Sequence, residues 1–139
     1  MPDDSPTPDE VWQLLTHIVM DTRDIWKRAV VERTGLPFSR FRVLRRLCAG
    51  PMTITQLARA ATMDAPATTV NVNDLEERGL VIRQTDPTDR RSKLVSITDA
   101  GRAMVAHAKT TPDPAPEELT ALSPNELRDL SGLLRKLEH

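Results

Sequence analysis

The sequence is poor in cysteine and in aromatic residues. Its 139 residues include one cysteine, Cys48, two tryptophans, two phenylalanines and no tyrosine. A single cysteine excludes an internal disulfide and is typical of a protein in a reducing cytosol. Because large aromatic side chains are scarce, we expect the core to consist mainly of Leu, Val, Ile, Ala and Met.

Long apolar runs are also absent. No stretch approaches the roughly 20 apolar residues that a membrane-spanning helix needs. The N-terminal segment MPDDSPTPDE has neither the basic head nor the apolar centre of a signal peptide. These absences predict a cytoplasmic protein with no membrane partner.

Signatures of catalysis and metal binding are missing as well. We find no Gly-rich phosphate loop, no nucleophile elbow and no pair of carboxylates on one helical face. His17, His107 and His139 lie too far apart in the sequence for a metal site. We therefore expect no enzyme, no cofactor and no metal. A Ser/His/Asp catalytic set can also form from residues that are distant in the sequence, and no sequence motif would reveal it. Catalysis therefore stays open as an alternative.

Charge is nearly balanced over the whole chain, at −1, but it is segregated along the sequence. Residues 1–22 carry five acids and no Lys or Arg. Residues 23–102 carry fifteen Lys or Arg and nine Asp or Glu, a net charge of +6, and residues 103–139 carry a net charge of −2. The basic central segment favours a nucleic-acid partner. The alternative is a solvated surface with scattered arginines.

Periodicity predicts a long first helix after a short tail. Residues 1–8 contain three prolines and two aspartates, which indicates a disordered tail. Asp9 is a candidate N-cap for a helix over residues 9–34, and Gly35 is a candidate stop. Apolar residues recur at helical spacing along this segment. They are Val11, Leu14, Leu15, Ile18, Ile25, Trp26 and Ala29.

The next segment predicts a helix-turn-helix. Ser39 is expected to cap a second helix, and Thr55 is expected to cap a short third helix. Asp64 then caps a longer helix over residues 65–78, with Pro66 in its first turn, where a missing N–H costs nothing. The side chains expected to face inward are Thr68, Val72 and Leu75. A short helix, a tight turn and a longer helix form the helix-turn-helix pattern.

Two strand-like runs follow directly. LVIRQT, residues 80–85, and SKLVSI, residues 92–97, flank a charged turn at residues 86–91. They predict a β-hairpin after the helix-turn-helix, and this order of elements is that of a winged helix. We therefore expect a mainly α fold with a small β-hairpin wing.

Proline interrupts the C-terminal third of the chain. Thr98 is expected to cap a helix that stops near Thr111, because the three prolines within residues 112–116 cannot lie inside a straight helix. A last helix begins with a capping box formed by Ser123 and Glu126. Its apolar seam is of the kind that pairs helices. The seam consists of Leu127, Leu130, Leu134 and Leu137.

Two segments give the chain a resemblance to the MarR family, the multiple-antibiotic-resistance type of bacterial transcription regulator. DPTDRRSKLVSITDAG, residues 86–101, is similar to the family's wing signature, and LEERGLVIRQTD, residues 75–86, to its junction of recognition helix and wing. The resemblance implies a homodimer in which the first and last helices of two chains interlock. It also implies that each chain presents one winged helix to double-stranded DNA. Most members are repressors, and many release DNA when a small phenolic or lipophilic effector binds.

With this resemblance, the chain divides into four parts. They are a disordered tail (1–8), a dimerisation helix (9–34), a winged helix-turn-helix DNA-binding domain (36–98) and C-terminal dimerisation helices (99–139) interrupted at 112–116. Family members usually run one long helix from the wing into the dimer region. The interruption therefore predicts a shorter or hinged dimer arm.

The charged turn, as a wing tip, is expected to contact DNA. Arg90 and Arg91 suit a narrow minor groove, where the potential is most negative, and Lys93 suits a phosphate. Asp86 or Asp89 is expected to hold one guanidinium by a bidentate pair, so that the other points outward. The alternative is a solubilising turn with weak surface ion pairs.

The outward face of the recognition helix, residues 65–78, is expected to read bases. Its residues are Pro66, Ala67, Thr69, Val70 and Asn73. Asn pairs with adenine, and Val, Ala or Thr methyl groups pack on the thymine methyl, so an A·T-rich half-site is predicted. The family often has a basic residue where Val70 stands. Arg40, Thr55, Gln56 and Arg59 are candidates for phosphate contacts, with plain solvent exposure as the alternative.

An effector site is implied at positions where the family holds ligands, between the dimer helices and the DNA-binding domain. The matching residues are His17, Met20, Trp26, Phe41, Arg45 and Met104. An Arg beside aromatic and Met side chains suits an aromatic carboxylate, and ordinary core packing is the alternative. Cys48 is interpreted as a small buried hydrophobe rather than a redox sensor. A winged helix that contacts only another protein also stays open.

Overall fold

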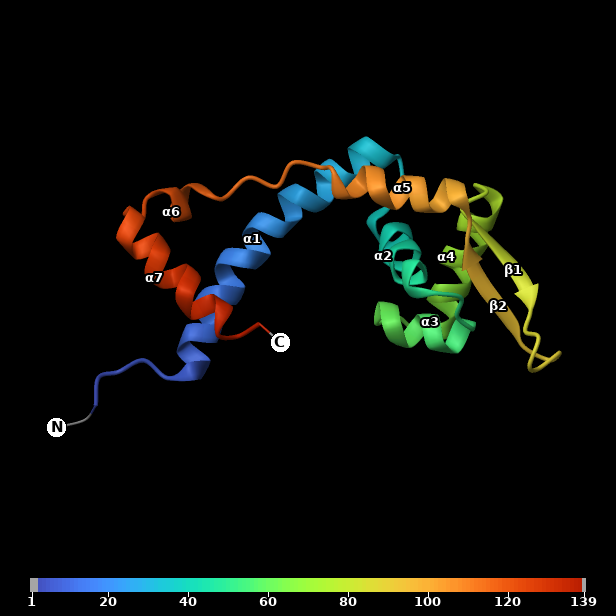
Figure 1. The fold of residues 1–139 in the computed structure, drawn as a ribbon, viewed down its shortest axis with the longest axis horizontal. Helices are drawn as coiled ribbons and strands as arrows, with labels where there is room; N and C mark the ends of the chain where they lie inside the picture. Colours follow the sequence, from blue (N-terminus) through green and yellow to red (C-terminus); the bar gives the residue numbers. More distant parts are fainter. Residues whose placement is uncertain (1–2, 139) are drawn as a thin grey trace. The chain divides into compact units, whose positions relative to one another are not determined.

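The computed structural model describes residues 3–138 (Figure 1). Met1, Pro2 and His139, which belong to the predicted tail and to the end of the predicted C-terminal helices, lie outside the described residues. The chain forms two compact units: Arg23–Thr111 is the larger, and the segments up to Thr22 and from Pro112 onward make up the smaller. Helix α1, Pro8–Thr34, contributes residues to both units.

The larger unit has the order of elements that the sequence predicts. Its elements are the last part of α1, α2 (Phe38–Arg46), a 3₁₀ turn (Leu47–Ala49), α3 (Ile54–Ala61), α4 (Ala65–Glu77), β1 (Val81–Thr85), β2 (Lys93–Ile97) and α5 (Asp99–Lys109). Helices α3 and α4 form the helix-turn-helix, and the β1–β2 hairpin follows as the wing (Figure 1). The prediction of a mainly α winged helix is confirmed.

Three of the predicted helix caps are confirmed. The Asp64 carboxylate accepts a hydrogen bond from the Ala67 N–H at 2.7 Å, and the Thr98 hydroxyl accepts one from the Gly101 N–H at 3.0 Å. Ser123 and Glu126 form the reciprocal capping box expected at the start of the last helix. Each cap satisfies backbone N–H groups that have no partner inside the helix.

Three other predicted caps were wrong. Helix α1 begins after Thr7, not Asp9, because Thr7 and Glu10 form a capping box in which each side chain accepts the other's N–H. Helix α3 begins after Thr53, not Thr55, through the same arrangement with Gln56. Helix α2 follows Pro37, and Ser39 lies inside it.

The core of the larger unit lies between α2, α3, α4, the hairpin and α5. Its fully buried side chains are aliphatic apart from Phe41 and Thr68, as the scarcity of aromatic residues predicts. They include Val43, Leu44, Leu47, Leu57, Val72, Leu75 and Val95. Burial of each such aliphatic side chain contributes roughly 1.5–3 kcal/mol. This packing fixes α4 and the wing on one scaffold.

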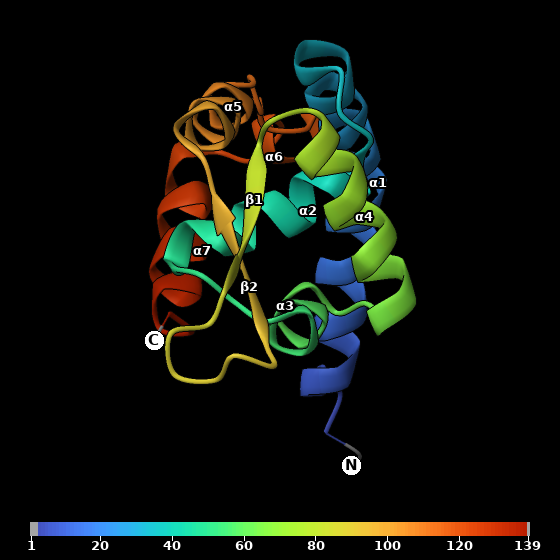
Figure 2. The same cartoon turned by 90° about the vertical axis from the view of Figure 1, so that its right-hand side faces the viewer.

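The wing is a two-stranded antiparallel sheet. Its register runs from Val81 opposite Ile97 to Thr85 opposite Lys93. Met52 joins the hairpin through a single bridge, in which Met52 and Val95 exchange hydrogen bonds of 3.1 and 2.7 Å. Figure 2 shows the hairpin descending past α3 and α4.

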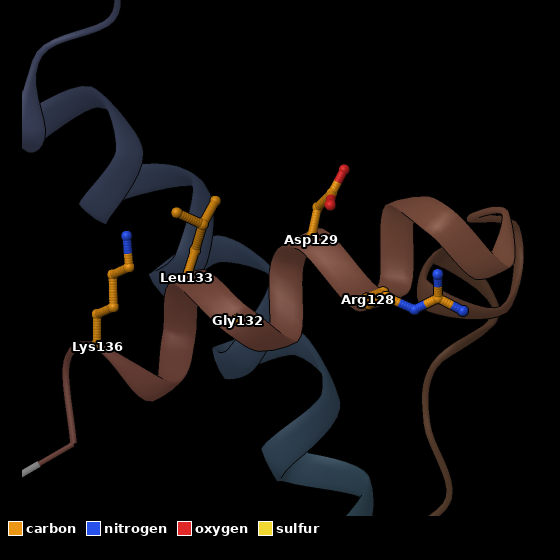
Figure 3. Close-up of a pocket in the computed structure, with 5 residues that line it drawn as sticks. All are labelled: Arg128, Asp129, Gly132, Leu133 and Lys136. Atoms are coloured by element: carbon orange, nitrogen blue, oxygen red, sulfur yellow. The ribbon is translucent and has the colours of Figure 1, made fainter.

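The smaller unit contains the beginning of α1, a short α6 (Glu117–Thr120) and α7 (Pro124–Arg135). Residues 112–116 contain no helix, so the predicted proline interruption is confirmed. A hollow of about 490 Å³ lies along α7, and its lining residues come from that helix and its C-cap (Figure 3). They are Arg128, Asp129, Gly132, Leu133 and Lys136.

The apolar stripe predicted along α1 is largely exposed within one chain. Leu14 is 64% exposed and Ile25 71%, and the seam residue Leu137, just beyond the end of α7, is 66% exposed. No helix among residues 3–138 is long and apolar enough to cross a membrane. Leu15, Trp26 and Ala29 are half-buried, so the exposed remainder of the stripe is the part that lacks cover from the described part of its own chain.

Candidate nucleic-acid interface

Helix α4 buries one face and exposes the other. Thr68, Val72 and Leu75 are fully buried, as predicted. Pro66, Val70 and Asn73 are exposed, and Ala67 and Thr69 are half-buried beside them. The five predicted base-reading residues thus lie on the accessible side of one helix. Val70, 57% exposed, presents an apolar surface at its centre.

The inner side of α4 is attached to α2 through Arg40. The Arg40 Nε donates to the Asp74 carboxylate at 3.1 Å, and another guanidinium nitrogen donates to the Asn71 side-chain oxygen at 3.1 Å. Arg78 donates to the same Asp74 oxygen at 2.9 Å. The hydrogen bond from Arg40, with the charge of Arg78, holds the pKa of Asp74 below its ordinary value, against the opposing effect of burial. Arg40, predicted as a phosphate contact, has its guanidinium engaged inside the domain.

The outer side of α4 is attached to the wing through Arg83, which the sequence analysis did not single out. Its guanidinium donates to the Asn73 side-chain oxygen at 2.6 Å and to the Glu76 carboxylate at 3.0 Å. Arg83 pairs with Val95 across the hairpin. Strand alternation was the signal that could have identified Arg83. Every second residue of a strand faces the same side, so Arg83 lies on the side of the strand that carries the buried Val81.

The wing tip is organised by its two aspartates. The Asp86 carboxylate accepts hydrogen bonds from the N–H and the hydroxyl of Thr88, at 2.9 and 2.8 Å, which lower the pKa of Asp86. Asp89 accepts from the Arg91 N–H at 3.0 Å, and the Arg91 Nε lies 3.9 Å from it. The prediction that one of these aspartates holds a wing guanidinium by a bidentate pair is wrong for the described residues. The carboxylates instead bind turn N–H groups, as short Asp side chains do in turns.

The basic side chains of the wing are directed to solvent. Arg90 and Arg91 are both exposed, and the Arg91 side chain is 97% exposed. Lys93 is exposed as well, and its ammonium donates to the Thr85 hydroxyl at 3.0 Å. The turn therefore presents two guanidinium groups beyond the end of the hairpin.

The start of α3 is a weaker candidate for phosphate. The Gln56 N–H donates to the Thr53 hydroxyl at 3.2 Å, and the Gln56 side-chain oxygen accepts the Thr53 N–H at 3.0 Å. Thr55 and Arg59 are exposed nearby. Because the capping box uses one N–H of the first turn, fewer donors face solvent than expected.

Three of the six predicted effector residues come together. Trp26 and Phe41 form an aromatic cluster with Phe38, with ring centroids 5.6–6.5 Å apart, and the Arg45 guanidinium lies 5.9 Å from the Phe41 ring centre. Met104 packs against the hydrophobic core, as does the half-buried Cys48. His17 and Met20 belong to the smaller unit and are exposed.

Comparison with known proteins agrees with this architecture. The MarR family model matches residues 34–92. A probable transcriptional regulator from Pseudomonas aeruginosa is 32% identical, over 88% of this chain and 95% of its own, with a TM-score of 0.62. CouR from Rhodococcus jostii, solved with p-coumaroyl-CoA, is 28% identical over 93% of this chain and 92% of its own, with a TM-score of 0.65.

A MepR variant from S. aureus, solved with an oligodeoxyribonucleotide, shares the fold at 20% identity, over 96% of both chains, with a TM-score of 0.62. The fold is thus shared with these solved structures, and the sequence match to the family covers the segment from the end of α1 to the wing turn. The chain belongs to the MarR family of transcriptional regulators.

Proposed function

We propose that the protein is a dimeric, sequence-specific DNA-binding regulator that acts as a repressor in the cytoplasm and has no catalytic activity. The recognition helix, residues 65–78, enters the major groove, and the wing, residues 86–91, enters the minor groove. The observation that carries this proposal is the exposure of both elements on one compact unit, residues 23–111. The outer face of α4 and the guanidinium groups of Arg90 and Arg91 are all accessible.

The outer face of α4 supports an A·T-rich half-site. Val70 and the Thr69 methyl offer apolar contact to thymine methyl groups, and Asn73 offers an amide to adenine. Pro66 and Ala67 are small enough to let the helix approach the base edges. This face has no cation of its own among residues 65–73, so attraction to phosphate falls to the wing.

The wing supplies the electrostatic part of binding. Arg90 and Arg91 contact the minor groove or its flanking phosphates, and Lys93 contacts the backbone. Asp86 and Asp89 keep the turn in one conformation through hydrogen bonds to its own N–H groups. A preformed turn loses less conformational entropy on binding.

The exposed apolar stripe supports a homodimer. Leu14, Ile18 and Met20 of α1, Leu134 of α7 and Leu137 just beyond α7 are all exposed in a single chain. A second copy would cover them, and in a two-fold dimer it would present two recognition helices to half-sites about one DNA turn apart. Light scattering at micromolar concentration tests this arrangement, and a monomer would contradict it.

An effector is proposed for the aromatic cluster of the larger unit. Trp26 and Phe41 provide ring surface, and Arg45 provides a cation for an aromatic carboxylate. If such an acid relieves repression, the same compound must bind the protein and weaken its binding to DNA. It should therefore shift both the melting temperature of the protein and its affinity for DNA. A thermal-shift screen with salicylate-like acids tests this, and no compound with both effects would leave the cluster as core packing.

Selection from random duplexes tests the DNA-binding proposal. We expect A·T-rich half-sites to be enriched, and Val70→Ala and Asn73→Ala to lose base preference at separate positions. Lys109→Ala is the matched control, because it removes an exposed cation of α5 outside the proposed interface. Enrichment of G·C-rich half-sites would contradict the base-reading assignment. The absence of any DNA binding would favour a winged helix that contacts another protein.

A further inference from the structure

Arg83 connects the wing strand β1 to the outer face of α4. Its guanidinium binds two side chains one helical turn apart, Asn73 at 2.6 Å and Glu76 at 3.0 Å. The Arg83 side chain is 25% exposed and that of Glu76 43%. Figure 2 shows β1 starting beside the end of α4.

This contact decides which way the Asn73 amide faces. A guanidinium has donors only, whereas an amide has a carbonyl oxygen that accepts and an NH₂ that donates. The oxygen must therefore lie toward Arg83 and the NH₂ away from it. If the amide turned over, it would lose this hydrogen bond and bring two donor groups together. Glu76 in turn restrains Arg83, since it accepts from another nitrogen of the same planar group.

We propose that Arg83 is a positioning residue that fixes the Asn73 amide for base recognition, an inference that rests on the proposed function. A bidentate contact to adenine needs one lone pair of the amide oxygen and one N–H of the NH₂. Arg83 uses one lone pair of that oxygen, and a carbonyl oxygen has two. The orientation needed for adenine is thus set before DNA arrives, at the junction of recognition helix and wing.

The effect of Arg83 on specificity can be separated from its effect on charge. Arg83→Lys keeps the positive charge, but its ammonium has no planar fork with which to bind Asn73 and Glu76 together. Glu76→Gln keeps Arg83 and removes the ionic part of its restraint. Gln84→Ala is the control for the strand, because Gln84 is exposed at the neighbouring position of β1.

The test measures affinity for four duplexes that differ only at the base pair where Asn73→Ala loses its preference. For the unmodified protein, a preference for adenine of about 5- to 150-fold is expected from one bidentate pair. In Arg83→Lys this preference falls at least several-fold, while preferences at other positions and the salt dependence stay unchanged. Glu76→Gln gives a smaller fall, and Gln84→Ala gives none.

Combining Arg83→Lys with Asn73→Ala tests whether Arg83 acts through Asn73. The quantity measured is the base preference of the double variant, which a purely structural role of Arg83 would not link to Asn73. The double variant should have the same base preference at that position as Asn73→Ala alone. Full retention of the adenine preference in both Arg83→Lys and Glu76→Gln would overturn the inference, as would an equal loss at every position. If Arg83→Lys does not fold, Glu76→Gln decides by the same criterion. The absence of sequence preference in the unmodified protein would instead overturn the proposed function.

Discussion

The guanidinium of Arg40 on α2 lies 3.1 Å from the carboxylate of Asp74 on α4. The same guanidinium binds Asn71, and Arg78 binds Asp74 from one turn further along α4. Side chains of two helices thus share one network beneath the proposed recognition face. This network fixes the rotation of α4 about its axis, and with it the set of residues that face solvent.

Replacing Arg40 with alanine should destabilise the domain. The change removes the hydrogen bonds to Asp74 and Asn71, and Asn71 is only 4% exposed. Hydrogen bonds to charged groups contribute roughly 1.5–3 kcal/mol each, and a buried acceptor left unpaired adds to the cost. The Arg40 and Asp74 side chains are 22% and 27% exposed, so solvent screening weakens their ion pair. We therefore expect the free energy of unfolding in urea to fall by roughly 1–3 kcal/mol in total.

Arg45→Ala is the matched control for Arg40→Ala. Arg45 lies on the same helix and is exposed, with its guanidinium near the Phe41 ring. A smaller loss is expected, since an exposed cation–π contact contributes about 0.5–1 kcal/mol. Equal stability of Arg40→Ala and the unmodified protein would show that Arg40 has no structural role.

Acid should weaken the α2–α4 network through Asp74. The Arg40 hydrogen bond lowers the pKa of Asp74 in the folded state, so the unfolded chain binds more protons than the folded one as acid is added. Its contribution is therefore complete above the unfolded carboxyl pKa of about 3.9 and is lost as the pH falls through the folded pKa. In Asp74→Asn this part of the acid dependence disappears.

Urea unfolding at several pH values between about 5 and 2 measures this effect. The curve for Asp74→Asn should fall less steeply toward low pH than that of the unmodified protein. Asp86 and Glu126 also have lowered pKa values, so some acid dependence remains in the variant. Parallel curves for the two proteins would contradict the role of Asp74.

Local signals were enough to predict the winged helix. Each of these signals determines the structure of only a few neighbouring residues. They are the cap at Asp64, the turn between the two strand-like runs and the prolines of residues 112–116. Two wrong caps also had a readable signal, because Thr7 and Thr53 are each followed three residues later by Glu or Gln, which is the capping-box pattern. Asp9 and Thr55 resemble caps by residue type alone.

The contacts between elements were not readable from the sequence. Arg40 was assigned to DNA because it is basic and lies near a helix start, and only the packing of α2 against α4 brings Asp74 to it. Arg83 was missed because its partners are seven and ten residues away, across a turn. Periodicity identified the apolar stripe along α1, but periodicity does not indicate which chain covers such a face. Its assignment to a dimer came from the family resemblance.

Asp86→Ala should loosen the wing without removing its positive charge. The Asp86 carboxylate binds the N–H and hydroxyl of Thr88, so the variant turn samples more conformations. DNA affinity should fall several-fold, while the number of phosphate contacts, read from the salt dependence, stays close to that of the unmodified protein. A binding assay at several salt concentrations measures both quantities, and unchanged affinity would mean that Asp86 does not organise the wing.

Gly101→Ala should destabilise the junction between wing and α5. A Cβ at this position would overlap the Leu80 carbonyl oxygen and lie 2.6 Å from the Ile97 side chain. Relief requires a backbone shift, for which the expected cost is about 1–3 kcal/mol. Gly132→Ala is the control, because a Cβ there meets no described atom within 4 Å. Thermal unfolding should show a lower melting temperature for Gly101→Ala only.

The salt dependence of DNA affinity in Arg90→Ala and Arg91→Ala tests the account most directly. Each guanidinium that contacts phosphate releases condensed counterions, so its loss should weaken binding to all DNA sequences. The slope of log affinity against log salt should become shallower by about one unit per lost contact. Affinity that stays unchanged in both variants at every salt concentration would contradict the assignment of the wing to DNA.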